Sequence, residues 1–550
     1  MSQQVSAEAL SALLEGKESF ALIDVREAGE YNSTHIPGAS LIPRRELEFR
    51  IAASAPHRAA HVILCDDDGR RATLAAGTLE SLGYTKVSVL DRGINRWASL
   101  DLPTEWGVNV PSKDFGEKVE VVHHVPEIDA TELHERIERG DKLVILDTRT
   151  PEEYRRFCIP GGRSVPGGEL ALRITDITAD LDPDTTVIVN CAGRTRSIIG
   201  TRVLQRMGRE NVLGLKNGTS GWVLAGYELE SGADRIDLPQ PSAEGLAEAE
   251  AYAERLAEED GVRYLDIGGL QGMMERSKSE TVYFVDVRTT AEYTEGHIPG
   301  FRWFPGGQAV QRSDEVAVVR NTPIVFACDD KVRSTLTASW YRQLGHEEVF
   351  AVAGGVGAWA AAGLDVETGA PSEPVLGMDE AREGLQFYTA EDLATAMFDN
   401  VLTELAMELG AEDDEEIVVG DQQVALFVDT SADFATGHIP GARWAPRGWL
   451  ELQIEHLVPS RETPIVVTCR DGRQSILAAA TLRGMGYSNV SVLDGGMIAW
   501  VAEELPAETG LSGVMSPPTD LVASGPDRNY ADMMTYLRWE TALGEKYAAG

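Results

Sequence analysis

A four-fold internal repeat constrains the fold of this chain more than any other feature of its sequence. The tetrapeptide His-Ile-Pro-Gly begins at His35, His297 and His438, and the variant Cys-Ile-Pro-Gly begins at Cys158. An apolar run ending in cysteine follows each tetrapeptide, and a tryptophan follows each of these cysteines: Cys65 and Trp97, Cys191 and Trp222, Cys328 and Trp359, Cys469 and Trp500. Successive cysteines are 126, 137 and 141 residues apart, and successive tryptophans are 125, 137 and 141 apart. Because this period is far longer than that of a solenoid repeat, each repeat is expected to be a domain.

Within each repeat, short apolar runs alternate with helical patterns. The runs at 22–25, 62–65 and 87–90 of repeat 1 are continuously apolar or nearly so, which is typical of strands buried on both faces. This alternation predicts an α/β fold in which a parallel sheet is flanked by helices on both faces. The expected domains are 1–106, 119–232, 246–369 and 385–510, followed by a tail at 511–550 with one helix that docks on a domain. Linkers rich in Pro, Gly and acidic residues are expected near 104–118, 231–245 and 367–385.

Composition excludes several classes of partner. The formal net charge is −39, with 88 acidic and 49 basic residues, which argues against nucleic acid or an anionic membrane as a partner. The five cysteines form no CxxC pair, so neither a disulfide framework nor a zinc site is expected. The N-terminal residues lack the order of a secretory signal, and free cysteines suit a reducing compartment, so we expect a cytoplasmic protein without a metal or cofactor.

The chemistry is expected at the four cysteines. Each cysteine ends a buried strand and precedes a helix, and ligands of open parallel sheets bind at the carboxyl ends of strands. A helix N-terminus favours a thiolate and a bound anion. The sequence therefore predicts nucleophiles at Cys65, Cys191, Cys328 and Cys469. The residues expected to bind an anionic substrate beside them are Arg71, Arg194, Arg196, Ser197, Arg333, Ser334, Arg470, Arg473 and Ser475.

The chain resembles a tandem array of rhodanese domains. The resemblance is carried by the DxR…EY…HIPGA segment, by the C-x-x-G-x-x-S loop, best seen at Cys469–Ser475, and by the closing GG…W segment. It implies a sulfurtransferase, in which a donor such as thiosulfate gives its outer sulfur to the cysteine thiolate. A thiophilic acceptor then removes this sulfur from the persulfide: cyanide in vitro, and a small thiol or a thioredoxin-like protein in the cell.

Several departures from the family pattern are visible. Matching the helices places one extra residue among Asp66–Asp68 of repeat 1. Repeat 4 has Ser431 where the others have the arginine of DxR, and its stretch from Asp429 to His438 is two residues shorter. The C-G-[ST]-G loop of mercaptopyruvate-using relatives is found in none of the repeats, which argues against mercaptopyruvate as the sulfur donor.

Two other functions remain open at this point. A binding or scaffold protein would be expected if most repeats had lost their cysteine. A phosphatase of the dual-specificity type would use Cys65-x5-Arg71, but the three aspartates between them would repel a phosphate dianion. Loop charge ranks the repeats as thiosulfate sites: +2 for repeat 2, +1 for repeat 4, zero for repeat 3 and −1 for repeat 1. The tetrapeptide histidines, the DxR aspartates and the tryptophans are expected to be structural.

Overall fold

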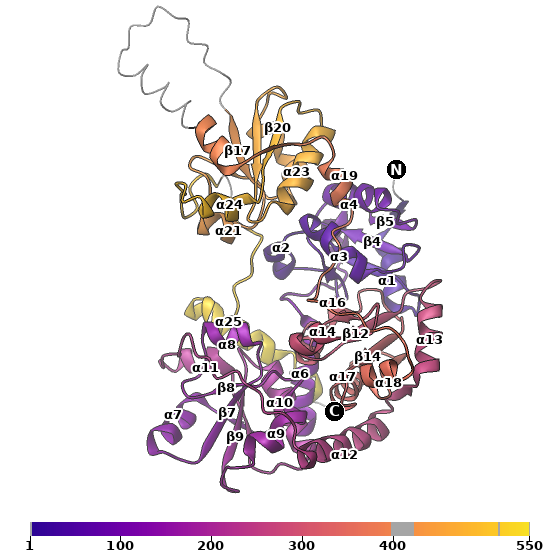
Figure 1. The fold of residues 1–550 in the computed structure, drawn as a ribbon, viewed down its shortest axis with the longest axis vertical. Coiled ribbons are helices and arrows are strands. Elements are labelled where there is room, and N and C mark those ends of the chain that lie inside the picture. Colours follow the sequence, from indigo (N-terminus) through magenta and orange to yellow (C-terminus); the bar gives the residue numbers. More distant parts are fainter. Residues whose placement is uncertain (1–2, 398–422, 515–516, 549–550) are drawn as a thin grey trace, which may run out of the picture.

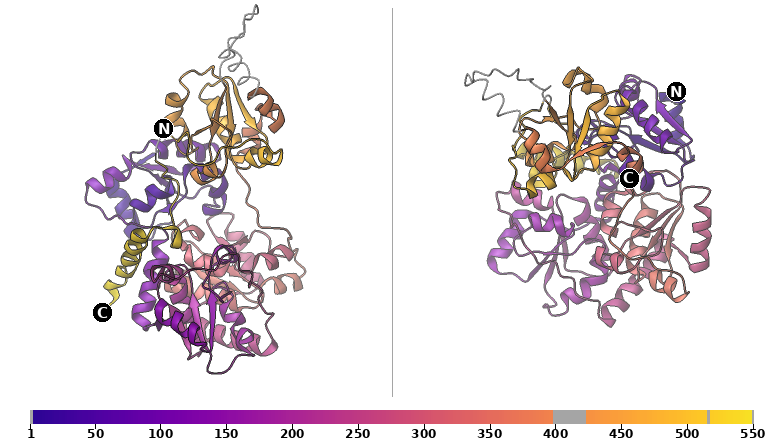
Figure 2. Two further views of the ribbon diagram at one scale, coloured as in Figure 1. Left: turned by 90° about the vertical axis from the view of Figure 1, so that its left-hand side faces the viewer. Right: turned by 45° about the horizontal axis from the view of Figure 1, so that its top comes forward.

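The computed structural model describes residues 3–397, 423–514 and 517–548, and in these residues it contains four parallel sheets of one topology (Figure 1). The five strands of each sheet follow the same spatial order, which is β1-β5-β4-β2-β3 in domain 1. Helices cover both faces of each sheet (Figures 1 and 2). The predicted fold class is therefore confirmed. No helix in the described residues is long and apolar enough to cross a membrane.

The elements of each domain follow one pattern. Domain 1 contains β1 (Gln3–Val5), α1 (Ala7–Glu15), β2 (Ala21–Asp24), α2 (Ala28–Ser33), β3 (Ser40–Leu41), η1 (Arg44–Glu46), α3 (Leu47–Ser54), β4 (Val62–Cys65), α4 (Arg70–Ser81), β5 (Val87–Leu90) and α5 (Gly93–Ser99). Domain 2 contains β6 (Glu127–Ile128), α7 (Ala130–Arg139), β7 (Leu143–Asp147), α8 (Pro151–Arg156), β8 (Arg163–Ser164), α9 (Leu170–Thr178), β9 (Thr186–Asn190), α10 (Thr195–Arg206), β10 (Val212–Leu215) and α11 (Gly218–Leu224).

The second half of the chain repeats this pattern. Domain 3 contains β11 (Arg263–Leu265), α13 (Ile267–Arg276), β12 (Tyr283–Asp286), α14 (Thr290–Glu295), β13 (Arg302–Trp303), α15 (Gly306–Gln311), α16 (Ser313–Val316), β14 (Ile324–Ala327), α17 (Val332–Gln343), β15 (Val349–Val352) and α18 (Gly355–Ala361). Domain 4 contains β16 (Gln386–Tyr388), β17 (Val424–Phe427), α21 (Ser431–Thr436), β18 (Arg443–Trp444), α22 (Leu450–Leu457), β19 (Ile465–Thr468), α23 (Arg473–Gly484), β20 (Val490–Leu493) and α24 (Gly496–Ala502).

Helices occupy much of the expected linkers. The helices α6 (Val110–His123), α12 (Ala243–Asp260) and α19 (Met378–Arg382) lie at or next to these segments. α6 packs against α10, and α12 packs against both α9 and α17. Phe115 of α6 and Leu256 of α12 are buried in a hydrophobic core that runs through domains 1, 2 and 3. The boundaries expected at 119 and 246 therefore fall inside helices that join neighbouring domains.

Two pairs of domains meet through equivalent turns, and domain 1 also contacts domain 3 through the shared core and the Arg50–Glu315 ion pair. Domains 2 and 3 meet at the turns before α9 and α15, where a Cβ atom added to Gly168 would lie 2.9 Å from the Gly307 nitrogen. Domains 1 and 4 meet through the corresponding turns, where the guanidinium of Arg447 donates to the carboxylate of Glu48 at 2.6 and 2.9 Å. Equivalent surfaces thus form both pairs (Figure 1).

The C-terminal tail crosses from domain 4 to domain 2. It contains η2 (Gly525–Asp527), α25 (Tyr530–Ala542) and α26 (Glu545–Ala548), two short helices in place of the single one expected. α25 and α26 pack against α6, and η2 packs against α11 (Figure 1). The tail therefore lies beside the cysteine loop of domain 2.

Candidate functional site

The strand ladders show that the four cysteines are not equivalent. In domain 4, Thr468 is the last residue of β19 and pairs with Phe427, so Cys469 is the first residue of the loop. In domain 1, Cys65 is itself the last residue of β4 and pairs with Asp24. The carbonyls of Cys469 and Asp66 then accept the equivalent backbone N–H groups, from Met497 and Ile94. Asp66, and not Cys65, thus holds the loop position in domain 1.

This finding corrects two expectations. The equivalence of Cys65 with the other cysteines is wrong, and so is the extra residue among Asp66–Asp68, because the loop of domain 1 has the common length and its cysteine lies one residue early. The sequence carried a signal of this shift. The first two cysteines are 126 residues apart, whereas the matching tryptophans are 125 apart.

In domain 1 a carboxylate fills the loop. The side chain of Asp66 accepts the backbone N–H groups of Arg71 at 2.7 Å and Ala72 at 3.2 Å, and also that of Gly69. Burial, and then Asp24, raise the pKa of Cys65 well above its ordinary value. The loop that would hold a substrate anion is therefore occupied by the protein's own carboxylate, and Cys65 is a buried neutral thiol.

In domain 4 the sulfur of Cys469 lies in a cradle of hydrogen-bond donors. Its Sγ accepts the backbone N–H groups of Gly472 at 3.1 Å and Ser475 at 3.4 Å, and lies 3.4 Å from Ser475 Oγ. Gly472 has φ of 91°, a left-handed conformation that favours glycine. Burial raises the pKa of Cys469, whereas the Ser475 hydroxyl and N–H lower it. These donors face the atom on which negative charge develops when the thiol ionises.

The cations of this loop are exposed. The Arg473 side chain pairs with Asp471 at 2.7 Å, and Arg470 lies 3.7 Å from Asp433. Both side chains are more than half exposed, so they border the loop and do not line its floor.

In domain 3 an aspartate contacts the cysteine. Cys328 Sγ lies 3.1 Å from Ser334 Oγ and accepts the Ser334 N–H at 3.3 Å, and the thiol donates to Asp330 Oδ1 at 3.4 Å. Burial, and then the Asp330 carboxylate, raise the pKa of this thiol. Lys331 takes the position of Gly472 with φ of 65°. The equivalent contact in domain 4 is longer, with Cys469 Sγ 3.9 Å from Asp471 Oδ1, so the carboxylate opposes ionisation more closely at Cys328.

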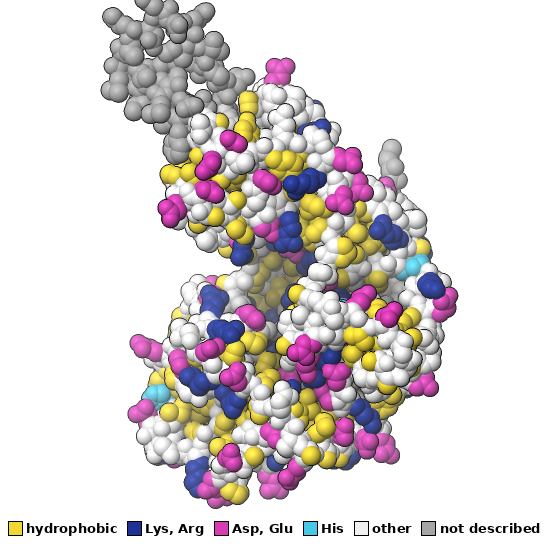
Figure 3. Space-filling view, in the orientation of Figure 1, with side chains coloured by type: hydrophobic (Ala, Val, Ile, Leu, Met, Phe, Trp, Pro, Cys, Tyr) yellow, Lys and Arg dark blue, Asp and Glu magenta, His cyan; other side chains and the backbone are white. Residues whose placement is uncertain are grey.

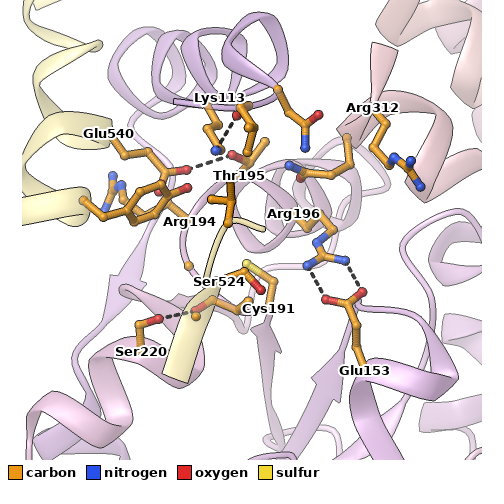
Figure 4. Close-up of a pocket in the computed structure, with 18 of the residues that line it drawn as sticks. Lys113, Glu153, Cys191, Arg194, Thr195, Arg196, Ser220, Arg312, Ser524 and Glu540 are labelled. Carbon is orange, nitrogen blue, oxygen red and sulfur yellow. Dashed lines mark hydrogen bonds and ion pairs between the residues drawn. The ribbon is translucent and has the colours of Figure 1, made fainter. Parts of the chain in front are cut away.

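In domain 2 the cysteine lies in a chamber of about 290 Å³ (Figure 4). Cys191 Sγ lies 3.5 Å from the hydroxyl of Ser197. Arg194 and Arg196, expected to give this loop a charge of +2, are both paired with carboxylates, Glu117 and Glu153. The chamber is walled by α6, α10, the end of α15 and the tail, and sequence reasoning missed most of it because these segments are distant in the chain.

In domains 1, 2 and 3, an arginine at the same loop position binds an equivalent glutamate. Arg71, Arg196 and Arg333 each form two hydrogen bonds to the glutamate of the Glu-Tyr pair: Glu30, Glu153 and Glu292 respectively, at 2.7–2.9 Å. Arg333 also donates to Glu169 of domain 2. In domain 4, Gln474 takes this position and donates to the carbonyl of Arg45. These side chains tie the loop to the domain and to its partner.

The DxR motif forms the expected ion pair in three domains: Asp24–Arg26, Asp147–Arg149 and Asp286–Arg288. In domain 4 the expected alignment is wrong. The β17 ladder places Phe427 at the aspartate position, so Asp429, not Ser431, stands at the arginine position and no residues are missing before His438. The Nδ1 atoms of His35, His297 and His438 lie 2.8–3.0 Å from backbone carbonyls, consistent with a structural role.

Comparison with known proteins places this geometry in a family. The rhodanese-like domain family matches at residues 6–100, 129–225, 268–362 and 406–503. A crystal structure of a thiosulfate sulfurtransferase from Pseudomonas aeruginosa is 36% identical, with a TM-score of 0.85, and the match covers 100% of this chain and 98% of that one. The thiosulfate sulfurtransferase of Azotobacter vinelandii is 26% identical over 239 residues, which are 36% of this chain and 87% of that protein. A mitochondrial thiosulfate/3-mercaptopyruvate sulfurtransferase of Arabidopsis thaliana is 24% identical over 40% of this chain and 69% of its own length. The chain belongs to the rhodanese-like family, of which it contains four tandem domains.

Proposed function

We propose that this protein is a sulfurtransferase that carries sulfane sulfur as a persulfide on Cys469. Thiosulfate is the proposed donor. The Cys469 thiolate attacks its outer sulfur, a new S–S bond forms, and sulfite leaves with the electron pair of the broken S–S bond. An acceptor thiolate then attacks the outer sulfur of the persulfide, and Cys469 leaves as the thiolate. Cyanide serves as acceptor in vitro, and a small thiol or a thioredoxin-like protein serves in a cytoplasmic setting.

The cradle around Cys469 is the observation that carries this proposal. The N–H groups of Gly472 and Ser475 point at Sγ, and backbone donors at a helix N-terminus stabilise a nearby anion. A persulfide extends the sulfur by one atom, so the anionic outer sulfur remains next to the same loop. In a chain of net charge −39, the exposed Arg470 and Arg473 also supply positive charge where a dianion approaches.

The other domains support different roles. Domain 1 has Asp66 in the loop, which favours a scaffold role for this domain. The same register argues against the phosphatase alternative, because the cysteine of Cys65-x5-Arg71 lies in a strand and not in the loop. Cys328 is bonded to Asp330, which opposes its ionisation. On this reading, the charge ranking of the loops is replaced by a ranking on donors to sulfur, with Cys469 first.

Mass spectrometry of the full-length protein after thiosulfate treatment tests the proposal. We expect the mass of one sulfur atom on the peptide containing Cys469, removable by cyanide. Cys469→Ser should lower thiosulfate turnover by at least about tenfold, or about 1.4 kcal/mol in activation free energy, because the nucleophile that takes up the sulfur is removed. Cys328→Ser is the matched control in an equivalent loop and should lower it less. Unchanged turnover in folded Cys469→Ser would overturn the assignment.

A further inference from the structure

The chamber around Cys191 differs from the loops of the other domains in its walls. It draws side chains from α6, α8, the cysteine loop and α11 of domain 2, from α15 of domain 3 and from the C-terminal tail (Figure 4). Lys113 and Glu540 lie on the Thr195 side of the chamber, whereas Arg196 and Glu153 lie on the opposite side (Figure 4). A composite enclosure of this kind can select a ligand by charge as well as by size.

Most charges in this chamber are already neutralised. Arg196 pairs with Glu153, and Arg194 pairs with Glu117. Arg312, contributed by domain 3, pairs with Glu315. These paired side chains form part of the walls and leave Glu540, Lys113 and Arg528 as the charged groups available to a ligand.

One carboxylate oxygen is left over. Glu540 of α25 is 1% exposed, and its Oε1 accepts the Thr195 hydroxyl at 3.0 Å. Its Oε2 is buried and has no hydrogen-bond partner among the described residues. A buried carboxylate oxygen without a donor costs free energy. It therefore favours a ligand that brings an N–H donor, such as an ammonium group.

Cationic groups are left over as well. Lys113 of α6 is 5% exposed, its Nζ donates to the Val108 carbonyl and lies over the rings of Tyr536 and Trp539, and no ion pair with a carboxylate is found for it within the described parts of the chain. Burial lowers the pKa of Lys113 to about 8. Arg528 stacks on the ring of Tyr536 at 3.7 Å and likewise lacks a carboxylate partner in the described residues. These two side chains favour a ligand that brings a carboxylate.

We propose that the Cys191 chamber binds a small α-amino-acid thiol, with its ammonium group at Glu540 Oε2, its carboxylate at Lys113 and Arg528, and its sulfur toward Cys191 Sγ. A chamber of about 290 Å³ is at the lower limit of ligand pockets, which favours a free amino acid over a tripeptide thiol. Cys191 lines the floor of the same chamber. The tail is thus a wall of a second site, with its own substrate class.

The inference rests on the proposed sulfur transfer for its chemistry. Thiosulfate loads Cys191 as proposed for Cys469: the Cys191 thiolate attacks its outer sulfur, and sulfite leaves with the electron pair of the broken S–S bond. The thiolate of the bound amino acid then attacks the outer sulfur of the Cys191 persulfide, a new S–S bond forms, and the bond to Cys191 Sγ breaks. Cys191 leaves as the thiolate, and the amino acid leaves as its persulfide. The step consumes neither an oxidant nor a reductant.

Binding of non-reacting analogues to the full-length protein tests the site apart from transfer. S-Methyl-L-cysteine has both charged groups, 3-(methylthio)propionate lacks the ammonium, and 2-(methylthio)ethylamine lacks the carboxylate. We expect calorimetry to show the first binding at least about tenfold more tightly than either of the others. It should also protect Cys191, but not Cys469, from alkylation by iodoacetamide. S-Methylglutathione should bind more weakly than S-methyl-L-cysteine.

Two variants assign the charged groups. Glu540→Gln should remove the preference over 3-(methylthio)propionate, and Lys113→Met should remove the preference over the amine. The exposed tail residue Glu545 gives the matched control, because Glu545→Gln leaves the chamber intact. If a variant misfolds, the analogue series on the unaltered protein still tests whether the chamber requires both an ammonium and a carboxylate group.

The proposal is overturned if the analogues bind the unaltered protein equally, or if S-methyl-L-cysteine leaves Cys191 open to alkylation. Either result leaves thiosulfate loading of Cys469 untouched, so it does not affect the proposed function. Conversely, a failure of thiosulfate to load Cys469 does not alter these binding measurements. A rise in Cys191 alkylation in Glu540→Gln that S-methyl-L-cysteine does not reduce would also overturn it, because the tail would then cover Cys191 without forming a ligand site.

Discussion

At the scale of single residues, one shift in register separates domain 1 from domain 4. Asp66 accepts the N–H groups that surround a sulfur in domain 4, so an anionic side chain replaces an anionic sulfur in the same cradle. Cys65 is turned into the core at the end of β4. We therefore expect Cys65→Ser to leave thiosulfate turnover unchanged and Cys65 to resist alkylation in the folded protein. A loss of turnover comparable to that of Cys469→Ser would contradict this register.

The pH dependence of sulfur loading follows from the environment of Cys469. Burial raises the pKa of Cys469, and only the thiolate attacks the donor. The rate of loading by thiosulfate should therefore rise with pH and still be rising at about pH 9, since the ordinary pKa of cysteine is about 8.5. Quenched-flow mass spectrometry of the Cys469 peptide measures this rate.

Ser475→Ala provides the control for this profile. The variant removes a hydroxyl that lowers the pKa of Cys469 while keeping the backbone N–H. The pH at which the loading rate rises should therefore be higher in Ser475→Ala than in the unaltered protein. A loading rate that is constant between about pH 7 and pH 9 would show that the thiolate is already formed at neutral pH.

At the scale of elements, much of the fold could be predicted from the sequence. The buried strands are visible in the sequence as continuous apolar runs, and the repeat shows that each domain has the same succession of elements, but the spatial order of the strands came from the structure. Most of α6 and the first turn of α12 fall in segments expected to be linkers, because Pro, Gly and acidic residues near them obscure a helical pattern whose stability comes from packing on neighbouring domains. The register of Cys65 was missed because the repeats were matched by sequence alone. Only the pairing of neighbouring strands shows that Cys65 lies one residue earlier than the other cysteines.

The turn before α9 offers a test at this scale. A Cβ atom on Gly168 would lie 2.9 Å from the Gly307 nitrogen, closer than real Cβ contacts allow, and backbone cannot yield cheaply. We expect Gly168→Ala to destabilise the domain 2–3 contact by about 1–3 kcal/mol, which is typical of overpacking. Gly272→Ala in α13, where a Cβ atom meets nothing within 4 Å, should instead be neutral or stabilising by up to about 1 kcal/mol. Thermal unfolding measures both, and equal midpoints for the two variants would refute the close approach.

At the scale of the whole molecule, the domain pairs determine how the sites are supported. The chain brings Glu48 of domain 1 to Arg447 of domain 4, and Glu169 of domain 2 to Arg333 of domain 3. Glu48 and Arg447 are 399 residues apart, so helical and strand patterns do not reveal their association. The turns themselves differ, reading Pro-Gly-Gly in domains 2 and 3 and Pro-Arg in domains 1 and 4, a signal that the sequence analysis missed. Figure 3 shows a hollow between domain 4 and domain 2, bordered by Lys and Arg side chains. The pairing therefore shapes surfaces that no isolated domain has.

Arg447 links this pairing to the cysteine of domain 4. Its guanidinium is buried, donates to Glu48 across the interface, and donates from Nε to Gln474 Oε1 at 2.7 Å. Gln474 precedes Ser475, whose N–H and hydroxyl hold Cys469 Sγ.

Arg447→Met leaves Glu48 buried without its partner, so we expect a loss of about 3–5 kcal/mol in unfolding free energy and slower loading of Cys469. Arg461→Met, which removes an exposed ion pair with Glu455, is the control and should change stability by less than about 0.5 kcal/mol. Adding Glu48→Gln to Arg447→Met should recover part of the loss, because no uncompensated carboxylate then remains at the interface. If the double variant is as unstable as the two single losses combined, the two side chains do not form a coupled pair and domain 1 does not support the Cys469 loop through them.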